Sequence, residues 1–139
     1  MSDKPLLAVD LLALRWGDMD ALGHLNNTLY FRFFEQARVE WLEHHGWRVS
    51  PDAGQGPVLA STACQFRQPL HYPATVRVET WVERLGNSSF TLGHRLCPAD
   101  QPEQIAAEGE AVLVWVDYAS GASQPLPERL RAQLREVVR

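Results

Sequence analysis

The stretch that decides the fold runs from Leu12 to Trp47 and reads LALRWGDMDALGHLNNTLYFRFFEQARVEWLEHHGW. An apolar run ends in Arg15 and Trp16, a short polar turn containing glycine follows, and an aromatic-rich segment comes next. This order predicts a strand, a turn and a helix. Such a turn gathers side chains at the exposed end of the strand, beside the free N–H groups of a helix start, which stabilise negative charge. We therefore expect the functional residues in this turn.

The helix is predicted from Asn27 to His45. Asn26 or Asn27 can serve as its N-cap, and Gly46 suits the position just after its end. Apolar residues recur at spacings of three and four along one stripe, which consists of Tyr30, Phe33, Phe34, Ala37 and Trp41. The other faces are also unusually apolar, so we expect the helix to be buried on several sides.

The rest of the chain is dominated by strand patterns. After a short tail at residues 1–5, a strand is expected over Leu6–Trp16, and a loop is expected over Val49–Gly56. Four further strands are predicted, at residues 58–68, 74–85, 88–96 and 104–117. Gly86-Asn87 predicts a hairpin and Cys97–Asp100 a turn. Pro127 suits the first turn of a final helix.

These elements together define a fold class. Consecutive strands joined by tight turns predict an antiparallel sheet, and one very apolar helix needs a sheet to bury it. We predict an α+β fold in which a curved antiparallel sheet surrounds one long central helix, as a single domain over residues 1–139. Long strands with two apolar-capable faces leave surface to cover, which predicts a homodimer.

Composition narrows the class of partners. The chain has 139 residues, 45% of them hydrophobic, and a formal net charge of −4, which argues against nucleic-acid binding. Cys64 and Cys97 form no CxxC unit, so neither a zinc site nor a redox pair is predicted. The N-terminal stretch is a poor signal peptide and too short to cross a bilayer, so we expect a cytoplasmic protein without membrane contact.

The polar residues of the turn allow four interpretations. Asp18, Asp20, His24 and Asn27 can be turn formers and helix caps, since these residue types favour turns for local reasons. The two carboxylates and the histidine can bind a divalent cation, although no second ligand cluster is visible. A phosphatase-like DxD is a third interpretation, but it normally needs a larger parallel α/β domain.

The fourth interpretation is acyl transfer or hydrolysis driven by one carboxylate. A thioester carbonyl needs an attacking oxygen, from the carboxylate or from a water that it deprotonates, and donors for the oxyanion that forms. Asp20 can supply the first, and backbone N–H groups at a helix start or glycine turn can supply the second. A serine nucleophile is disfavoured because the sequence has no GxSxG motif.

The segment RWGDMDALGHLNNTLYFRFFEQAR resembles the N-terminal signature of the hotdog-fold 4-hydroxybenzoyl-CoA thioesterase family. Members share a strand, a D-x-D-x-x-G turn and a helix with a tyrosine and an acidic residue near an arginine. The similarity is dense over about the first forty-five residues, and the downstream strand order agrees. The resemblance implies a hotdog fold whose protomers pair their sheets, and an acyl-CoA thioesterase active as a homodimer or homotetramer, without a metal or redox cofactor.

The resemblance also implies roles for residues of the turn. Asp20 matches the catalytic carboxylate, as nucleophile or general base, and Asp18 is then a supporting residue. Asn27 stands where similar proteins carry a substrate-contacting Tyr or His, so this chain departs from them and the substrate stays open. His24 follows Gly23 in a GHxNN pattern, and it can contact the substrate or cap the turn.

The remaining implied roles concern the oxyanion and coenzyme A. The Gly56-Pro57-Val58 turn aligns with a glycine turn that polarises the thioester carbonyl in similar thioesterases, where the site forms between protomers. Pro57 has no N–H, so Gly56 or Val58 must donate, unless this is an ordinary loop-to-strand turn. Phosphates of coenzyme A could meet one of four basic residues, namely Arg67, His71, Arg77 or Arg95.

We therefore predict an acyl-CoA thioesterase. A non-catalytic protein that binds acyl-CoA or an acyl carrier is the alternative, because a fold does not fix a function. A hotdog dehydratase is a third possibility, disfavoured because the turn resembles that of thioesterases.

Overall fold

The computed structural model describes residues 5–138 and has one sheet and two α-helices. The predicted tail lies, apart from Pro5, outside the described residues. The chain forms β1 (Ala8–Ala13), a short 3₁₀ turn η1 (Trp16–Asp18) and α1 (Asn27–His44) in this order. A second 3₁₀ turn η2 (Pro51–Ala53), strands β2 (Gln55–Phe66), β3 (Thr75–Leu85), β4 (Ser89–Pro98) and β5 (Ala107–Asp117), and α2 (Glu128–Arg135) follow. The predicted order of strand, helix, four strands and helix is confirmed.

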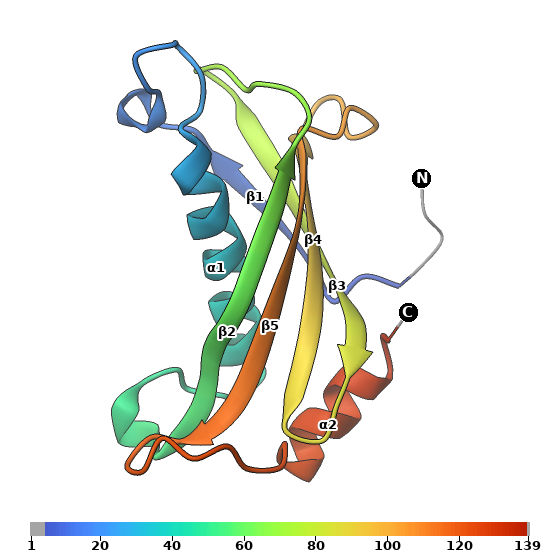
Figure 1. The fold of residues 1–139 in the computed structure, drawn as a ribbon. Helices are drawn as coiled ribbons and strands as arrows, with labels where there is room; N and C mark the ends of the chain where they lie inside the picture. Colours follow the sequence, from blue (N-terminus) through green and yellow to red (C-terminus); the bar gives the residue numbers. More distant parts are fainter. Residues whose placement is uncertain (1–4, 139) are drawn as a thin grey trace.

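The five strands form one antiparallel sheet in the order β1-β3-β4-β5-β2 (Figure 1). β1 and β2 are therefore the two edges. The predicted α+β class and the antiparallel sheet are confirmed, and the arrangement is consistent with the predicted hotdog fold. α1, which is 18 residues long, lies against one face of the sheet (Figure 1).

Helix α1 begins and ends at the predicted signals. The side chain of Asn26 accepts a hydrogen bond from the N–H of Thr28 at 2.9 Å, which identifies Asn26 as the N-cap. Gly46 follows the helix with φ +88°, a value that favours glycine. None of the helices in the described part of the chain is long and apolar enough to span a membrane.

The core fills the space between the helices and one face of the sheet. Alternate residues of β3, such as Val76 and Val78, are fully buried beneath α1, because side chains two apart on a strand point to the same face of the sheet. At the other end of α1, the core is completed by Leu130 and Leu134 of α2. Burial of such side chains in one shared core is what fixes both helices to the sheet.

Three polar residues, His94, Thr80 and Arg38, lie inside this core. His94 of β4 is fully buried and stacks on Phe34, with ring centroids 4.7 Å apart. Its Nδ1 lies 3.0 Å from Thr80 Oγ1, and its Nε2 lies 3.4 Å from an Arg38 nitrogen. Burial, assisted by the charge of Arg38, lowers the pKa of His94 to about 3. The imidazole is therefore neutral in the folded protein.

Several predicted boundaries differ from the structure by one to three residues. β1 ends at Ala13, because residues 16–18 turn as η1. Strand β4 continues through Cys97 and Pro98, where a turn is expected from sequence, because β3 pairs with both residues. Pro98 is the last residue of the strand, where a missing N–H costs little. β2 begins at Gln55, inside the predicted loop.

Candidate active site

The turn between β1 and α1 is closed by backbone hydrogen bonds around Asp20. The N–H of Asp20 donates to the carbonyl oxygen of His24, and the N–H of Gly23 donates to that of Asp20, both at 2.9 Å. Gly23 has φ +78°, a backbone conformation that glycine adopts without strain. The turn therefore holds the half-buried Asp20 side chain in a defined place.

One oxygen of the Asp20 carboxylate is used to hold this turn. Oδ1 accepts hydrogen bonds from the N–H of Leu22 at 2.9 Å and of His24 at 3.4 Å. Oδ2 takes part in none of the hydrogen bonds among residues 5–138. One oxygen therefore orients the group, and the other can act on a substrate or a water as nucleophile or base.

Asp18 has a different environment, inside the protein. It is buried, its Oδ2 accepts the N–H of Arg15 at 2.8 Å, and the Arg15 guanidinium lies 2.9 Å from Oδ1. Its carbonyl oxygen accepts the N–H of Asn26 at 3.0 Å. Asp18 thus links the start of the turn to the helix N-cap. Within residues 5–138, no group of three or more His, Cys, Asp or Glu side chains is arranged to hold a metal ion.

A groove of about 260 Å³ lies beside this turn, and two of the predicted substrate-binding residues line it. These are His24 and Asn27, the latter being the first residue of α1. The other lining residues are Leu25, Tyr30, Phe66, Arg67, Gln68 and Pro69. Asp20 lines a second hollow of about 490 Å³, together with Gly23 and Tyr72. The hollow and the groove share no lining residue, but they are neighbours at the turn, because Gly23 lines the hollow and the next residue, His24, lines the groove.

Tyr30 is a lining residue that sequence reasoning assigns only to the apolar stripe of the helix. Its ring is 2% exposed and packs edge-on against Phe66, with centroids 5.0 Å apart. Burial raises the pKa of Tyr30 to about 12, and the charges of Cys64 and then Asp20 add to this shift. The sequence does contain one signal that could have identified Tyr30 as a site residue. Tyr30 is the residue with a hydroxyl on a stripe otherwise built from Phe, Ala and Trp, and it lies ten positions after Asp20.

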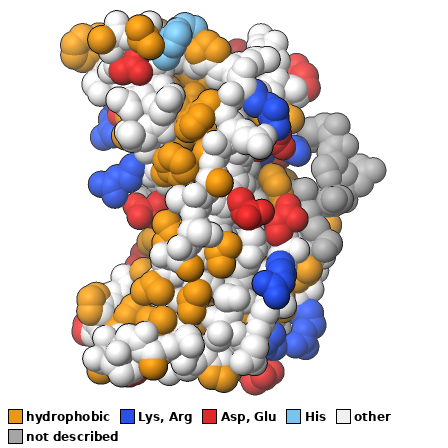
Figure 2. All heavy atoms as spheres, viewed as in Figure 1, with side chains coloured by type: hydrophobic (Ala, Val, Ile, Leu, Met, Phe, Trp, Pro, Cys, Tyr) orange, Lys and Arg blue, Asp and Glu red, His pale blue; other side chains and the backbone are white. Residues whose placement is uncertain are grey.

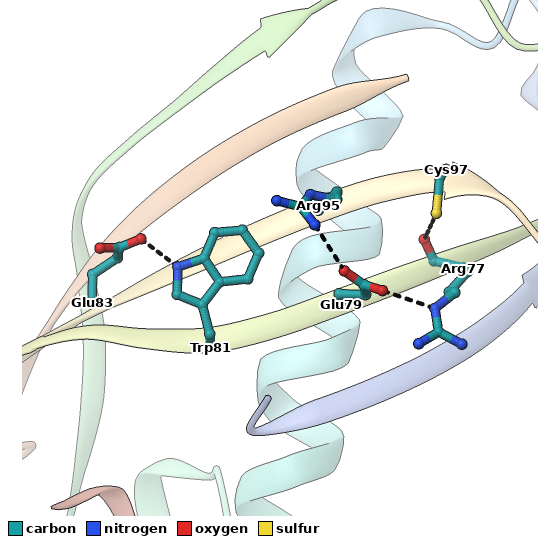
Figure 3. Close-up of polar contacts among 6 residues, drawn as sticks. All are labelled: Arg77, Glu79, Trp81, Glu83, Arg95 and Cys97. Carbon is teal, nitrogen blue, oxygen red and sulfur yellow. Dashed lines mark hydrogen bonds and ion pairs between the residues drawn. The ribbon is translucent and has the colours of Figure 1, made fainter. Parts of the chain in front are cut away.

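The four basic residues considered for phosphate contact fall into two groups. Arg67 lines the groove, and the His71 ring meets the His24 ring edge-on, with centroids 5.1 Å apart. Arg77 and Arg95 lie elsewhere, on the sheet face opposite α1, where both bond to the buried carboxylate of Glu79 at 3.0 and 3.4 Å (Figure 3). Only Arg67 and His71 are therefore near the groove.

The predicted oxyanion donors do not form a turn. Gly56 and Val58 lie in β2, paired with Val116 and Val114 of β5. Gly56 is needed here for packing, because a β-carbon at this position would overlap the ring of Tyr118. β2 starts at the end of the molecule away from the Asp20 turn, and only its last residue, Phe66, reaches the groove (Figure 1).

This separation is large. Gly56 and Phe66 are ten residues apart along one strand, a span of roughly 30 Å at the usual rise per residue. Within one chain, Gly56 and Val58 therefore do not meet Asp20. The structure brings together the turn, His24, Asn27, Tyr30 and Arg67, and it places the two predicted backbone donors elsewhere.

Comparison with known proteins shows which family the chain is similar to. Residues 14–134 match the profile of the thioesterase-like superfamily. The solved PA2801 protein of Pseudomonas aeruginosa, named "a putative Thioesterase", superposes with a TM-score of 0.87 and is 44% identical, covering 91% of this chain and 97% of that chain. The superfamily is broader than the predicted 4-hydroxybenzoyl-CoA thioesterase family, so that narrower assignment stays a prediction.

Two further relatives are similar in sequence. A "Putative esterase" of Aquifex aeolicus is 34% identical over 79 residues, which span 55% of this chain and 62% of that protein, less than two thirds of its length. The acyl-CoA thioester hydrolase YbgC of Escherichia coli O6:H1 is 22% identical over 121 residues, which span 86% of this chain and 89% of that protein.

Proposed function

Because the chain belongs to the thioesterase-like superfamily, we propose that it hydrolyses the thioester of an acyl-CoA to the free acid and coenzyme A. The observation that carries this proposal is the environment of the Asp20 carboxylate. One of its oxygens accepts hydrogen bonds from the turn, whereas the other takes part in no hydrogen bond within residues 5–138. The similarity to an acyl-CoA thioester hydrolase supports the substrate class. In this proposal residues 1–139 act as one hotdog thioesterase domain.

Asp20 drives the reaction in this proposal. As a general base it takes a proton from water while the water oxygen bonds to the carbonyl carbon, and that proton passes to the leaving thiolate when the carbon–sulfur bond breaks. As a nucleophile it bonds to the carbonyl carbon, the carbon–sulfur bond breaks, and the coenzyme A thiolate leaves and takes a proton from solvent. Water then hydrolyses the acyl-enzyme anhydride to the free acid and the Asp20 carboxylate. Asp18 supports both routes by tying the turn to Arg15 and to the backbone of Asn26.

The substrate lies along the groove beside the turn. His24 and Asn27 contact it there, and Arg67 lies at the same groove, where a phosphate of coenzyme A could bind. Arg67 is half exposed and already pairs with Glu108 at 2.8 Å, so a phosphate would compete with that carboxylate. Arg77 and Arg95 are not assigned a role, because both bond to Glu79 on the sheet face opposite α1.

The oxyanion donors are proposed to come from a second protomer. β2 is an edge strand, and most of its residues are exposed, including Val58, Leu59 and Phe66. Figure 2 shows apolar side chains reaching the surface on this face. Antiparallel pairing of two such edges sets the start of the partner strand beside the end of this one. Gly56 and Val58 of one protomer would then donate at the groove of the other, in a homodimer or a homotetramer built from it.

The proposal is tested by Asp20→Asn. The amide keeps an oxygen for the turn N–H groups but cannot act as base or nucleophile, so we expect thiol release to fall by at least about 1,000-fold with an unchanged melting temperature. Asp100→Asn, at an exposed turn, is the matched control and should keep wild-type turnover. Thiol release is measured over benzoyl-, hexanoyl- and palmitoyl-CoA.

Three results would contradict this assignment. An Asp20→Asn variant with near wild-type turnover would remove the carboxylate from the mechanism. Wild-type protein that binds the acyl-CoA panel tightly but releases no thiol would instead favour the non-catalytic binding protein. Hydration of an enoyl-CoA without thiol release would indicate a dehydratase.

A further inference from the structure

One buried hydroxyl at the groove has no partner within the protein. Tyr30 lies in the first turn of α1, and its ring is held by Phe66 and by core residues that include Leu25 and Phe34. The hydroxyl takes part in none of the hydrogen bonds among residues 5–138. Buried tyrosine hydroxyls usually have a partner, so this one calls for an explanation.

The hydroxyl is not sealed in the core. The only fully buried side-chain nitrogen or oxygen atoms without a partner in residues 5–138 are Asp10 Oδ2 and Arg95 Nε. The Tyr30 hydroxyl therefore keeps some exposed area, and Tyr30 forms part of the groove wall with His24 and Asn27. A hydroxyl of this kind, fixed by a buried ring and reachable from a groove, is suited to bond a ligand there.

The charge state of Tyr30 favours donation. Burial, with the charges of Cys64 and Asp20, raises its pKa to about 12, so the phenol keeps its proton near neutral pH. Asp20 is the smallest of the causes of this shift. The geometry places the two groups in adjoining recesses, because Asp20 and Gly23 line one of them, and His24 and Tyr30 line the other. Attack on a carbonyl needs two groups. A carboxylate drives the attack on the carbon, and a neutral hydrogen-bond donor stabilises the negative charge that develops on the carbonyl oxygen.

We propose that the Tyr30 hydroxyl donates a hydrogen bond to the thioester carbonyl oxygen and stabilises the oxyanion formed when Asp20 drives the attack. This inference rests on the proposed function and adds a donor to it. Tyr30 and Asp20 belong to the same protomer, whereas Gly56 and Val58 would come from the partner. Tyr30 keeps its proton throughout, whether the attacking oxygen is that of water or of Asp20.

The test is Tyr30→Phe, which removes the hydroxyl and keeps the ring packed against Phe66. Loss of one oxyanion donor costs about 100-fold in kcat, so we expect a fall of this order with KM changed less than about threefold. The melting temperature should stay within about 2 °C of wild type, because no hydrogen bond within residues 5–138 is lost. Thiol release from benzoyl-, hexanoyl- and palmitoyl-CoA gives kcat and KM.

Cys64→Ala is the matched control, because Cys64 is the other side chain whose charge acts on Tyr30. It leaves the hydroxyl and Asp20 in place, and its kcat should stay within about threefold of wild type. An equal loss in both variants would trace the effect to the packing around Tyr30 and overturn the role of the hydroxyl.

The remaining outcomes distinguish a failure of this inference from a failure of the proposed thioesterase function. Full turnover of Tyr30→Phe, in an enzyme that Asp20→Asn inactivates, would overturn the inference and leave the proposed function intact. Wild-type protein that releases no thiol from any of the three substrates would overturn both. A fall in kcat for Tyr30→Phe alone, with KM and melting temperature preserved, supports the inference.

Discussion

Replacing Asp10 by Asn should stabilise the protein near neutral pH. Asp10 lies on β1 and faces α1, where Glu40 and His44 are its titratable neighbours. Its Oδ2 is buried and has no hydrogen-bond donor among residues 5–138. Glu40 can share a hydrogen bond with Asp10 only if one of the two carboxyls carries a proton. Burial, then the hydrogen bond and the charge of Glu40, raise the pKa of Asp10 from 3.8 to about 6, although His44 opposes the shift.

The magnitude follows from linkage between proton binding and folding. A carboxyl whose pKa is raised on folding stabilises the native state below its unfolded pKa, and this contribution is lost as pH rises through the folded pKa. A rise from 3.8 to about 6 corresponds to about 3 kcal/mol at pH 7. Because Asp10 is only partly buried, solvent screening reduces this to roughly 1 to 2 kcal/mol.

The assay is urea unfolding of wild type and Asp10→Asn at pH 7 and pH 4. We expect the variant to be more stable by roughly 1 to 2 kcal/mol at pH 7 and nearly equal at pH 4, where wild-type Asp10 is protonated. Asp100→Asn, on an exposed turn, should differ from wild type by less than about 0.5 kcal/mol at both pH values. A variant that is less stable than wild type at pH 7, or equally shifted at both pH values, would refute this reasoning.

Two further predictions concern the sheet. Gly93→Ala should destabilise the protein by about 1 to 3 kcal/mol in urea unfolding, because a methyl group there would overlap the buried Trp81 ring; Gly17→Ala, with open space around it, should change stability by less than about 0.5 kcal/mol. His94, with its pKa lowered to about 3, stabilises the protein above pH 6.5 and loses this contribution as pH falls. Wild type should lose about 2 kcal/mol between pH 7 and 5 relative to His94→Gln, and parallel pH profiles would exclude this origin.

Local chemistry made most elements predictable from the sequence. α1 was identifiable because its apolar spacing, the Asn26 cap and Gly46 are all signals that act within a few residues. The strand at residues 74–85 was identifiable for the same reason, because its sequence pattern lies within one short segment. The boundaries that differ, at the start of β2 and the end of β4, are set by pairing with β5 and β3 instead.

Some residues of the candidate site could likewise be predicted from local sequence, and others could not. Asp20, His24 and Asn27 could be singled out from sequence because they share one turn and helix start, whereas their separate roles come only from the resemblance to the thioesterase family and stay predictions. Tyr30 was missed as a site residue because an apolar stripe does not reveal which of its members borders a groove. Arg77 and Arg95 could not be excluded before the sheet brought Glu79 between them.

The sequence by itself determined the order of the elements, the α+β class and the position of the Asp20 turn, because these depend on patterns within short segments. The tertiary structure alone decided that Tyr30, Phe66 and Arg67 meet at the groove beside that turn, and that Gly56 and Val58 lie at the far end of β2. The physical reason is that strand register and helix docking, which the whole core fixes, bring residues together over separations that no local pattern records.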